Sequence, residues 1–101
     1  MAEAGRRIRI DKWLWQARFF KSRTLAAERV AAGAVRLNGQ RLFKPAHPVG
    51  AGDVLTFAQG GVIRVVRVLA AGTRRGPAAE ARLLYADLDE PDDPALASGA
   101  E

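Results

Sequence analysis

The sequence of 101 residues predicts one α+β domain, in which two N-terminal helices pack on a small, mostly antiparallel sheet and a short C-terminal helix follows. Three observations predict this fold class. Apolar residues recur at helical spacing over residues 10–32. An Asn38-Gly39 pair separates two short alternating segments, and Gly60-Gly61 separates two longer ones. A chain of this length can bury only one small core.

The first helix is expected over residues 12–20, with Asp11 as its N-cap, because a carboxylate can accept a backbone N–H of the first turn. At about 100° per residue, one side of this helix is apolar and should face the core. That inner side comprises Ile10, Trp13, Leu14, Ala17 and Phe20. Trp15 and Phe19 fall on the other side. We favour their burial against other elements, and the alternative is that they stack on unpaired RNA bases.

The second helix is expected over residues 23–32. Ser22 is a residue type preferred at an N-cap, and Gly33 can adopt the left-handed conformation that ends a helix. The inner stripe of this helix should contain Leu25, Ala26, Val30 and the stem of Arg29. Because only Lys21-Ser22 separates the two predicted helices, the chain should bend sharply between them.

Asn38-Gly39 tolerates the two positive φ values of a type I′ turn and so predicts a hairpin. Strands are predicted over residues 35–37, 40–42, 54–57 and 62–69. Pro77 suits the first turn of a final helix over residues 78–85. Leu84 and Leu88 are expected to anchor that helix on the sheet.

The chain divides into four predicted segments: a flexible basic arm (1–7), a folded domain (8–70), a loop with the C-terminal helix packed on that domain (71–90), and an acidic, disordered tail (91–101). The tail is predicted from its composition. Six acidic residues and no cation follow from Asp87 onward, and Pro91 and Pro94 interrupt the segment.

Positive charge is concentrated in the first half of the chain. Residues 1–44 hold 11 Lys and Arg against 3 acidic residues, whereas residues 45–101 hold 5 against 8. A cationic half on a small domain indicates a polyphosphate partner, and we favour nucleic acid over an anionic membrane surface. The first residues do not resemble a signal peptide, and no apolar run reaches the roughly 18 residues of a membrane span. A cytoplasmic protein is expected.

The candidate RNA-binding residues lie around the predicted bend between the helices. They are Arg9, Lys12, Arg18, Lys21, Ser22, Arg23 and Arg29, extended over the hairpin by Arg36, Arg41 and Lys44. Phosphates are bound by guanidinium and ammonium groups and by backbone N–H groups at helix N-termini. The alternative is a solvated surface, and the scarcity of balancing acids argues against it. For the three hairpin cations the two interpretations are even, and capping alone explains Ser22.

Other candidate sites are weak. Arg74-Arg75 could form a second phosphate contact, although a polar loop is the favoured interpretation. His47 has no carboxylate or cysteine beside it in the sequence and is not expected to bind metal or act as a base. Asp53 is expected to be structural. No nucleophile elbow or Gly-rich phosphate loop is present, so we expect no catalysis, no cofactor and no metal.

The run from Arg9 to Gln40 closely resembles the S-four RNA-binding domain, or alpha-L motif. The matching positions are Arg9, Asp11, Leu14, Lys21, Ser22, Arg23, Gly33, Val35, Asn38 and Gly39, followed by Gly52-Asp53-Val54-Leu55. The resemblance implies an alpha-L RNA-binding fold over residues 8–70. By position it also implies RNA contacts at Arg9, Lys12, Arg18, Lys21, Ser22 and Arg23.

Residues 11–21 and 74–85 are also similar to a bacterial family of ribosome-associated heat-shock proteins of fifteen kilodaltons. This resemblance implies binding of ribosomal RNA in the free large subunit that carries a nascent chain on tRNA, during ribosome rescue or recycling under stress. The short acidic tail departs from that family's longer basic extension. We expect a monomer. Two alternatives are a basic protein-interaction or membrane-surface module and a detached RNA-binding accessory of an RNA-modifying enzyme.

Overall fold

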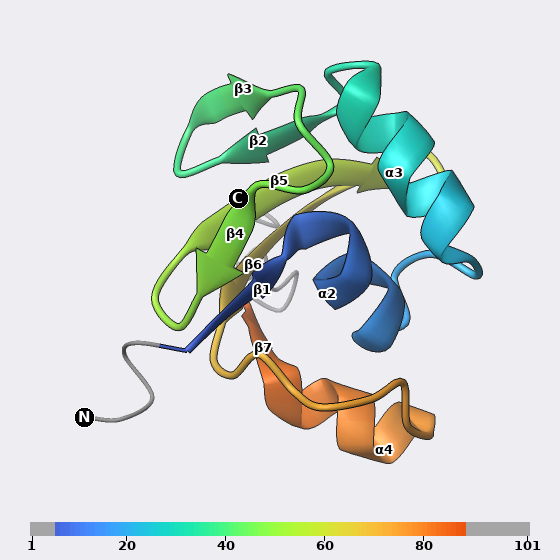
Figure 1. The fold of residues 1–101 in the computed structure, drawn as a ribbon, viewed down its shortest axis with the longest axis vertical. Coiled ribbons are helices and arrows are strands. Elements are labelled where there is room, and N and C mark those ends of the chain that lie inside the picture. Colours follow the sequence, from blue (N-terminus) through green and yellow to red (C-terminus); the bar gives the residue numbers. More distant parts are fainter. Residues whose placement is uncertain (1–5, 89–101) are drawn as a thin grey trace, which may run out of the picture.

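The computed structural model describes residues 6–88 (Figure 1). In chain order, the elements are β1 (Arg7–Arg9), α2 (Ile10–Gln16), α3 (Arg23–Ala31), β2 (Val35–Leu37), β3 (Gln40–Leu42), β4 (Pro48–Gly50), β5 (Val54–Gln59), β6 (Val62–Val68), α4 (Ala78–Ala81), the 3-10 turn η1 (Arg82–Leu84) and β7 (Tyr85–Asp87). The predicted α+β class with two N-terminal helices, antiparallel sheets and a short C-terminal helix is confirmed. Residues 1–5 of the predicted arm and the predicted tail lie outside the described residues.

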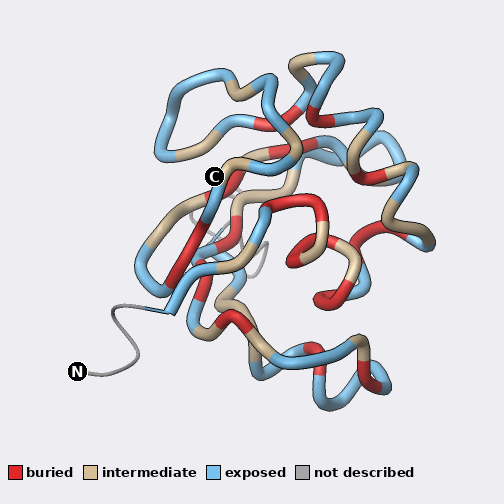
Figure 2. Tube along the Cα trace, in the orientation of Figure 1, coloured by how far each residue is buried: buried red, intermediate tan, exposed pale blue. Residues whose placement is uncertain are grey.

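Two antiparallel sheets form the β layer. β1 pairs with β4, and the larger sheet has the strand order β3-β2-β5-β6-β7. Helices α2 and α3 lie together in front of the larger sheet in Figure 1. The buried residues concentrate where these helices face the strands, as the red segments of Figure 2 show. One core therefore supports both helices and the turn between them.

Helix α2 differs from its prediction at both ends. It begins at Ile10 after Arg9, and its first N–H groups donate to carbonyls of the preceding loop, Ile10 N to His47 O at 2.8 Å and Asp11 N to Pro45 O at 3.2 Å. The prediction that Asp11 is the N-cap is therefore wrong. The helix ends at Gln16 because the chain reverses at Arg18, whose φ is +67°.

The early end of α2 decides where Phe19 lies. After the reversal at Arg18, Phe19 turns inward and is 6% exposed. Its ring centroid lies 5.0 Å from that of Phe57 and 4.6 Å from that of Tyr85. The favoured interpretation, burial, is confirmed for Phe19, and the predicted inner stripe of α2 is also buried throughout.

Helix α3 follows its prediction closely. Ser22 caps it, because its Oγ accepts a hydrogen bond from Leu25 N at 3.0 Å. Ala26 and Val30 are fully buried. Gly33 has φ +79°, a conformation that favours glycine, and a Cβ there would also displace the exposed Phe43 ring, which lies 2.6 Å away.

The Asn38-Gly39 hairpin is confirmed, with φ values of +51° and +87°. The C-terminal helix predicted over residues 78–85 is confirmed, but it is shorter than predicted and changes type within its length. Its first turn forms α4, η1 follows, and Tyr85 begins β7 because its backbone pairs with Val68 at the edge of the sheet. Leu88 is 41% exposed and does not anchor this segment.

Candidate nucleic-acid interface

The turn between α2 and α3, residues 17–22, lies at the centre of the predicted RNA-binding residues. The structure distributes the predicted cations over separate groups instead of one patch. Arg9 and Arg23 meet at Asp11, and Arg36 faces Arg41 on the hairpin. Another group lines a cavity beside the turn.

The first group, which we call the Asp11 cluster, consists of Asp11, Arg9 and Arg23. Arg9 donates two hydrogen bonds to the carboxylate, at 3.0 Å from Nε and 2.9 Å from a terminal nitrogen. A terminal nitrogen of Arg23 lies 3.7 Å from the same carboxylate. The Asp11 side chain is 4% exposed, whereas those of Arg9 and Arg23 are 50% and 42% exposed. One buried acid thus orients two solvent-facing cations, and the Asp11 cluster as a whole keeps a net positive charge.

The Asp11 carboxylate raises the pKa of Arg9 above its ordinary value, first through the hydrogen bonds and then through Coulomb attraction. A raised pKa on a base stabilises the fold at any pH below the ordinary value. That value is already far above neutrality, so the charge of Arg9 does not change over the physiological range. The bidentate geometry also leaves part of the guanidinium facing solvent, where it can donate to a phosphate.

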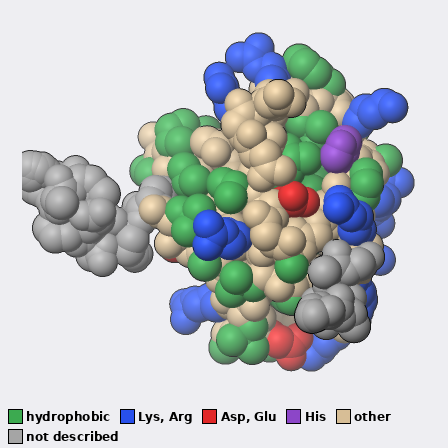
Figure 3. All heavy atoms as spheres, turned by 90° about the vertical axis from the view of Figure 1, so that its left-hand side faces the viewer, with side chains coloured by type: hydrophobic (Ala, Val, Ile, Leu, Met, Phe, Trp, Pro, Cys, Tyr) green, Lys and Arg blue, Asp and Glu red, His purple; other side chains and the backbone are tan. Residues whose placement is uncertain are grey.

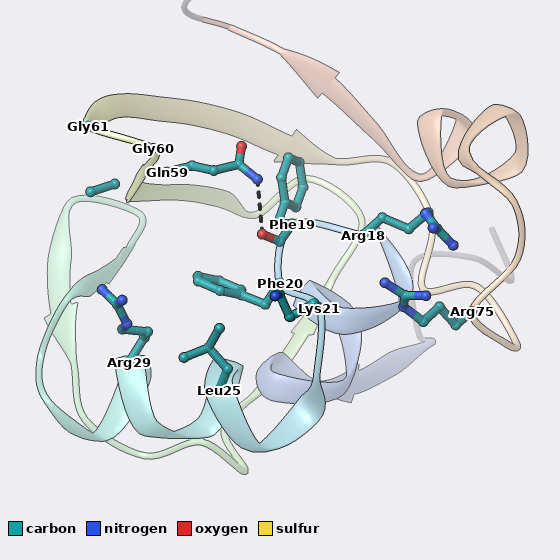
Figure 4. Close-up of a pocket in the computed structure, with 11 residues that line it drawn as sticks. Arg18, Phe19, Phe20, Lys21, Leu25, Arg29, Gln59, Gly60, Gly61 and Arg75 are labelled. Carbon is teal, nitrogen blue, oxygen red and sulfur yellow. Dashed lines mark hydrogen bonds between the residues drawn. The ribbon is translucent and has the colours of Figure 1, made fainter.

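The second group of cations lines a cavity of about 550 Å³ beside the α2–α3 turn (Figure 4). Four cations line it: Arg18, Lys21, Arg29 and Arg75. Among the described residues of its wall none is acidic. We call these residues the cavity cations.

Two of the cavity cations are held in place by backbone carbonyls. Arg18 donates to Gly76 O at 3.0 Å, and Arg75 donates to Trp15 O at 3.1 Å. The guanidinium carbon of Arg75 also lies 5.7 Å from the centroid of the Trp15 ring. A carbonyl orients a guanidinium without neutralising its charge, so both groups are preorganised to bind an anion.

Arg75 was only a weak candidate from the sequence, because a polar loop was the favoured interpretation there. Its place beside the α2–α3 turn depends on contacts across about 60 positions of the chain. It also lies over Trp15, which is half-buried and is not a free stacking surface. The run Arg74-Arg75-Gly76-Pro77 was the only available signal.

The third group is on the hairpin. Arg36 and Arg41 lie directly opposite each other in the β2–β3 pairing, and both are exposed. Like charges that face each other across a strand pair destabilise it. Lys44 is exposed beyond β3, and Lys12 is half-buried on α2. These cations lie apart from the cavity, and Figure 3 shows basic side chains scattered over the face that carries the histidine.

Several other charged or polar residues have structural partners. Arg64 pairs with Asp87 at 2.8 Å, and Arg74 pairs with Glu80 at 2.8 Å. Asp53 accepts from Gly50 N at 2.9 Å, which confirms its structural role. Over residues 6–88, no group of three or more His, Cys, Asp or Glu side chains could hold a metal ion. No helix in that same stretch is long and apolar enough to cross a membrane.

Comparison with known proteins defines the class first. The S4 domain family matches residues 8–55, which contain the Asp11 cluster, the α2–α3 turn and the hairpin. Arg75 and the β5–β6 turn lie outside the match. The chain is thus an S4-domain protein, in agreement with the resemblance found in the sequence.

Within this class, the chain belongs to the family of Heat shock protein 15. It is 48% identical over 83 residues to Heat shock protein 15 of Escherichia coli K12, across 82% of this chain and 62% of that protein. It is 44% identical over 88 residues to the Aeromonas salmonicida homologue, across 87% of this chain and 66% of that protein. The chain therefore matches less than two thirds of the length of these relatives.

A solved structure of Vibrio cholerae Heat Shock Protein 15 superposes with a TM-score of 0.81 at 34% identity, covering 95% of this chain and 97% of that one. That structure is described as trimeric. The expectation of a monomer thus has no support from the comparisons. The S4 domain and the homology to Heat shock protein 15 do support RNA binding by this chain.

Proposed function

We propose that this chain is a non-catalytic RNA-binding protein that docks on ribosomal RNA of the free large subunit. The large subunit that it binds still carries a nascent chain on tRNA. The role of the protein is rescue or recycling of ribosomes under stress in the cytoplasm. The observation that carries the proposal is the set of oriented cations around the α2–α3 turn, in a chain of the Heat shock protein 15 family.

The proposed mechanism is recognition of phosphates by preorganised groups. Asp11 orients Arg9 and Arg23, while Lys21 is exposed on the turn. Little side-chain freedom is lost on binding when guanidinium groups are already held in position. Contacts of this kind set affinity and orientation, and they carry no base information themselves.

Sedimentation of cell lysate on a gradient tests which ribosomal particle the protein binds. The protein should travel with free large ribosomal subunits and should leave those fractions after ribonuclease digestion. Migration with small subunits would contradict the large-subunit assignment. Retention in a high-mass complex after digestion would instead favour a protein-interaction module.

A further inference from the structure

We propose that the cavity beside the α2–α3 turn receives one unstacked nucleotide of the bound RNA. The inference rests on the proposed RNA binding and adds a chemical class of ligand for one site. It concerns a cavity formed partly by the β5–β6 turn and Arg75, which lie outside the S4 match. The ligand is a nucleoside monophosphate unit that has left the helical stack.

The volume and the apolar lining of the cavity fit a nucleotide. Its volume of about 550 Å³ falls within the roughly 300–1,000 Å³ of small-molecule sites. In Figure 4, Phe20 and Leu25 project into it from the turn and from α3, opposite Gly60-Gly61. Phe20, which is 8% exposed, and the half-buried Leu25 both line the cavity and give it an apolar surface for a base.

The charges of the cavity fit a phosphate. Arg18 and Arg75 lie on the same side in Figure 4, and Arg29 lies near the glycine turn. Within residues 6–88, the Arg18 and Arg75 guanidinium groups contact backbone carbonyls and the Trp15 ring, and these contacts leave their positive charges uncompensated. Single-stranded RNA is bound by this combination, in which an apolar surface contacts the base and cations contact its phosphates.

The backbone at Arg18 is a second, independent observation. Its φ of +67° lies in the left-handed region, where glycine is the favoured residue and other side chains are strained. Such strain concentrates at functional sites. A glycine would make the same chain reversal more easily, but it would remove one cation from the cavity wall.

Binding of two RNA hairpins to the 101-residue chain tests the proposal. One hairpin is a perfect duplex, and the other is the same duplex with a single bulged 2-aminopurine, whose fluorescence rises when it leaves the stack. We expect the bulged RNA to bind roughly tenfold more tightly, which is the size of one base-stacking contact. Binding should also raise the fluorescence. Free adenosine monophosphate should bind far more weakly than the bulged RNA.

Two variants remove the proposed contacts. Arg18→Gly suits the local backbone and should fold, and Arg75→Gln keeps a side-chain donor for Trp15 O. Both should bind the bulged RNA no better than the duplex. Arg67→Gln is the matched control, because Arg67 is exposed on β6, does not line the cavity, and should leave the preference intact.

The possible failures can be told apart. Equal affinity of the wild type for both hairpins, or equal loss of both in the variants, would overturn the cavity proposal while RNA binding stands. Binding of adenosine monophosphate as tight as that of the bulged RNA would also overturn it, because the cavity would then serve a free nucleotide. Absence of binding to both hairpins would overturn the proposed function together with the cavity.

Discussion

Asp11 shows how a single side chain can organise positive charge. A carboxylate in a candidate RNA-binding surface repels phosphate, yet this one is almost fully buried behind two exposed arginines. Its effect on RNA is therefore indirect, because it holds Arg9 and Arg23 in position. We regard Asp11 as a positioning residue.

Replacement of Asp11 by Asn tests that role. Asp11→Asn keeps the shape but removes the charge that both arginines share, so the free energy of unfolding should fall by about 1 kcal/mol. Urea denaturation measures the change. Glu28→Gln, on the exposed side of α3, is the matched control and should stay within about 0.5 kcal/mol of wild type. A variant as stable as wild type would show that the Asp11 cluster does not stabilise the fold.

At the scale of elements, the sequence predicted those elements that local contacts define. It did not predict the strands that form only by pairing with distant parts of the chain. Ser22 and Gly33 define the ends of α3 through contacts within a few residues, and Asn38-Gly39 defines its hairpin in the same way. The strands β1, β4 and β7 have three residues each, and β1 pairs with β4 across about 40 positions of the chain. Such pairing leaves no periodic pattern in the sequence.

Two substitutions of Ser22 separate its role as the cap of α3 from its proposed role in RNA binding. Ser22→Ala removes the acceptor for Leu25 N and should cost about 1 kcal/mol of stability. Ser22→Asp restores an acceptor, so stability should recover, but its negative charge should weaken RNA binding. Thermal unfolding and RNA titration on the same samples check both. Unchanged RNA affinity in Ser22→Asp would place the RNA away from this helix end.

Arg36 and Arg41 repel each other across the hairpin, so this pair is expected to lower stability. Arg41→Glu converts a repulsive cross-strand pair with Arg36 into an attractive one, which should stabilise the protein by a few tenths to about 1 kcal/mol. If the hairpin contacts RNA, the same change should weaken binding. Arg41→Gln is the control that removes repulsion without adding attraction. A loss of stability in Arg41→Glu would show that the two side chains point apart in solution.

At the scale of the whole molecule, charge and resemblance predicted the class but not the shape of the site. The sequence predicted the cations around the bend as RNA-binding residues, whereas the cavity joins residues 18–29, the β5–β6 turn and Arg75. No local pattern brings these three segments together. The sequence offered Arg75 only as a weak candidate, and the fold shows that it lies over Trp15 beside the cavity.

The salt dependence of RNA binding tests the central claim most directly. If about six cations around the turn each neutralise one phosphate, log K against log salt should have a slope of roughly −4 to −5. Lys21→Gln or Arg23→Gln should each reduce the magnitude of the slope by about one unit, whereas Arg67→Gln should leave it unchanged. A slope near zero for wild type, or no change in Lys21→Gln and Arg23→Gln, would contradict RNA binding at the α2–α3 turn.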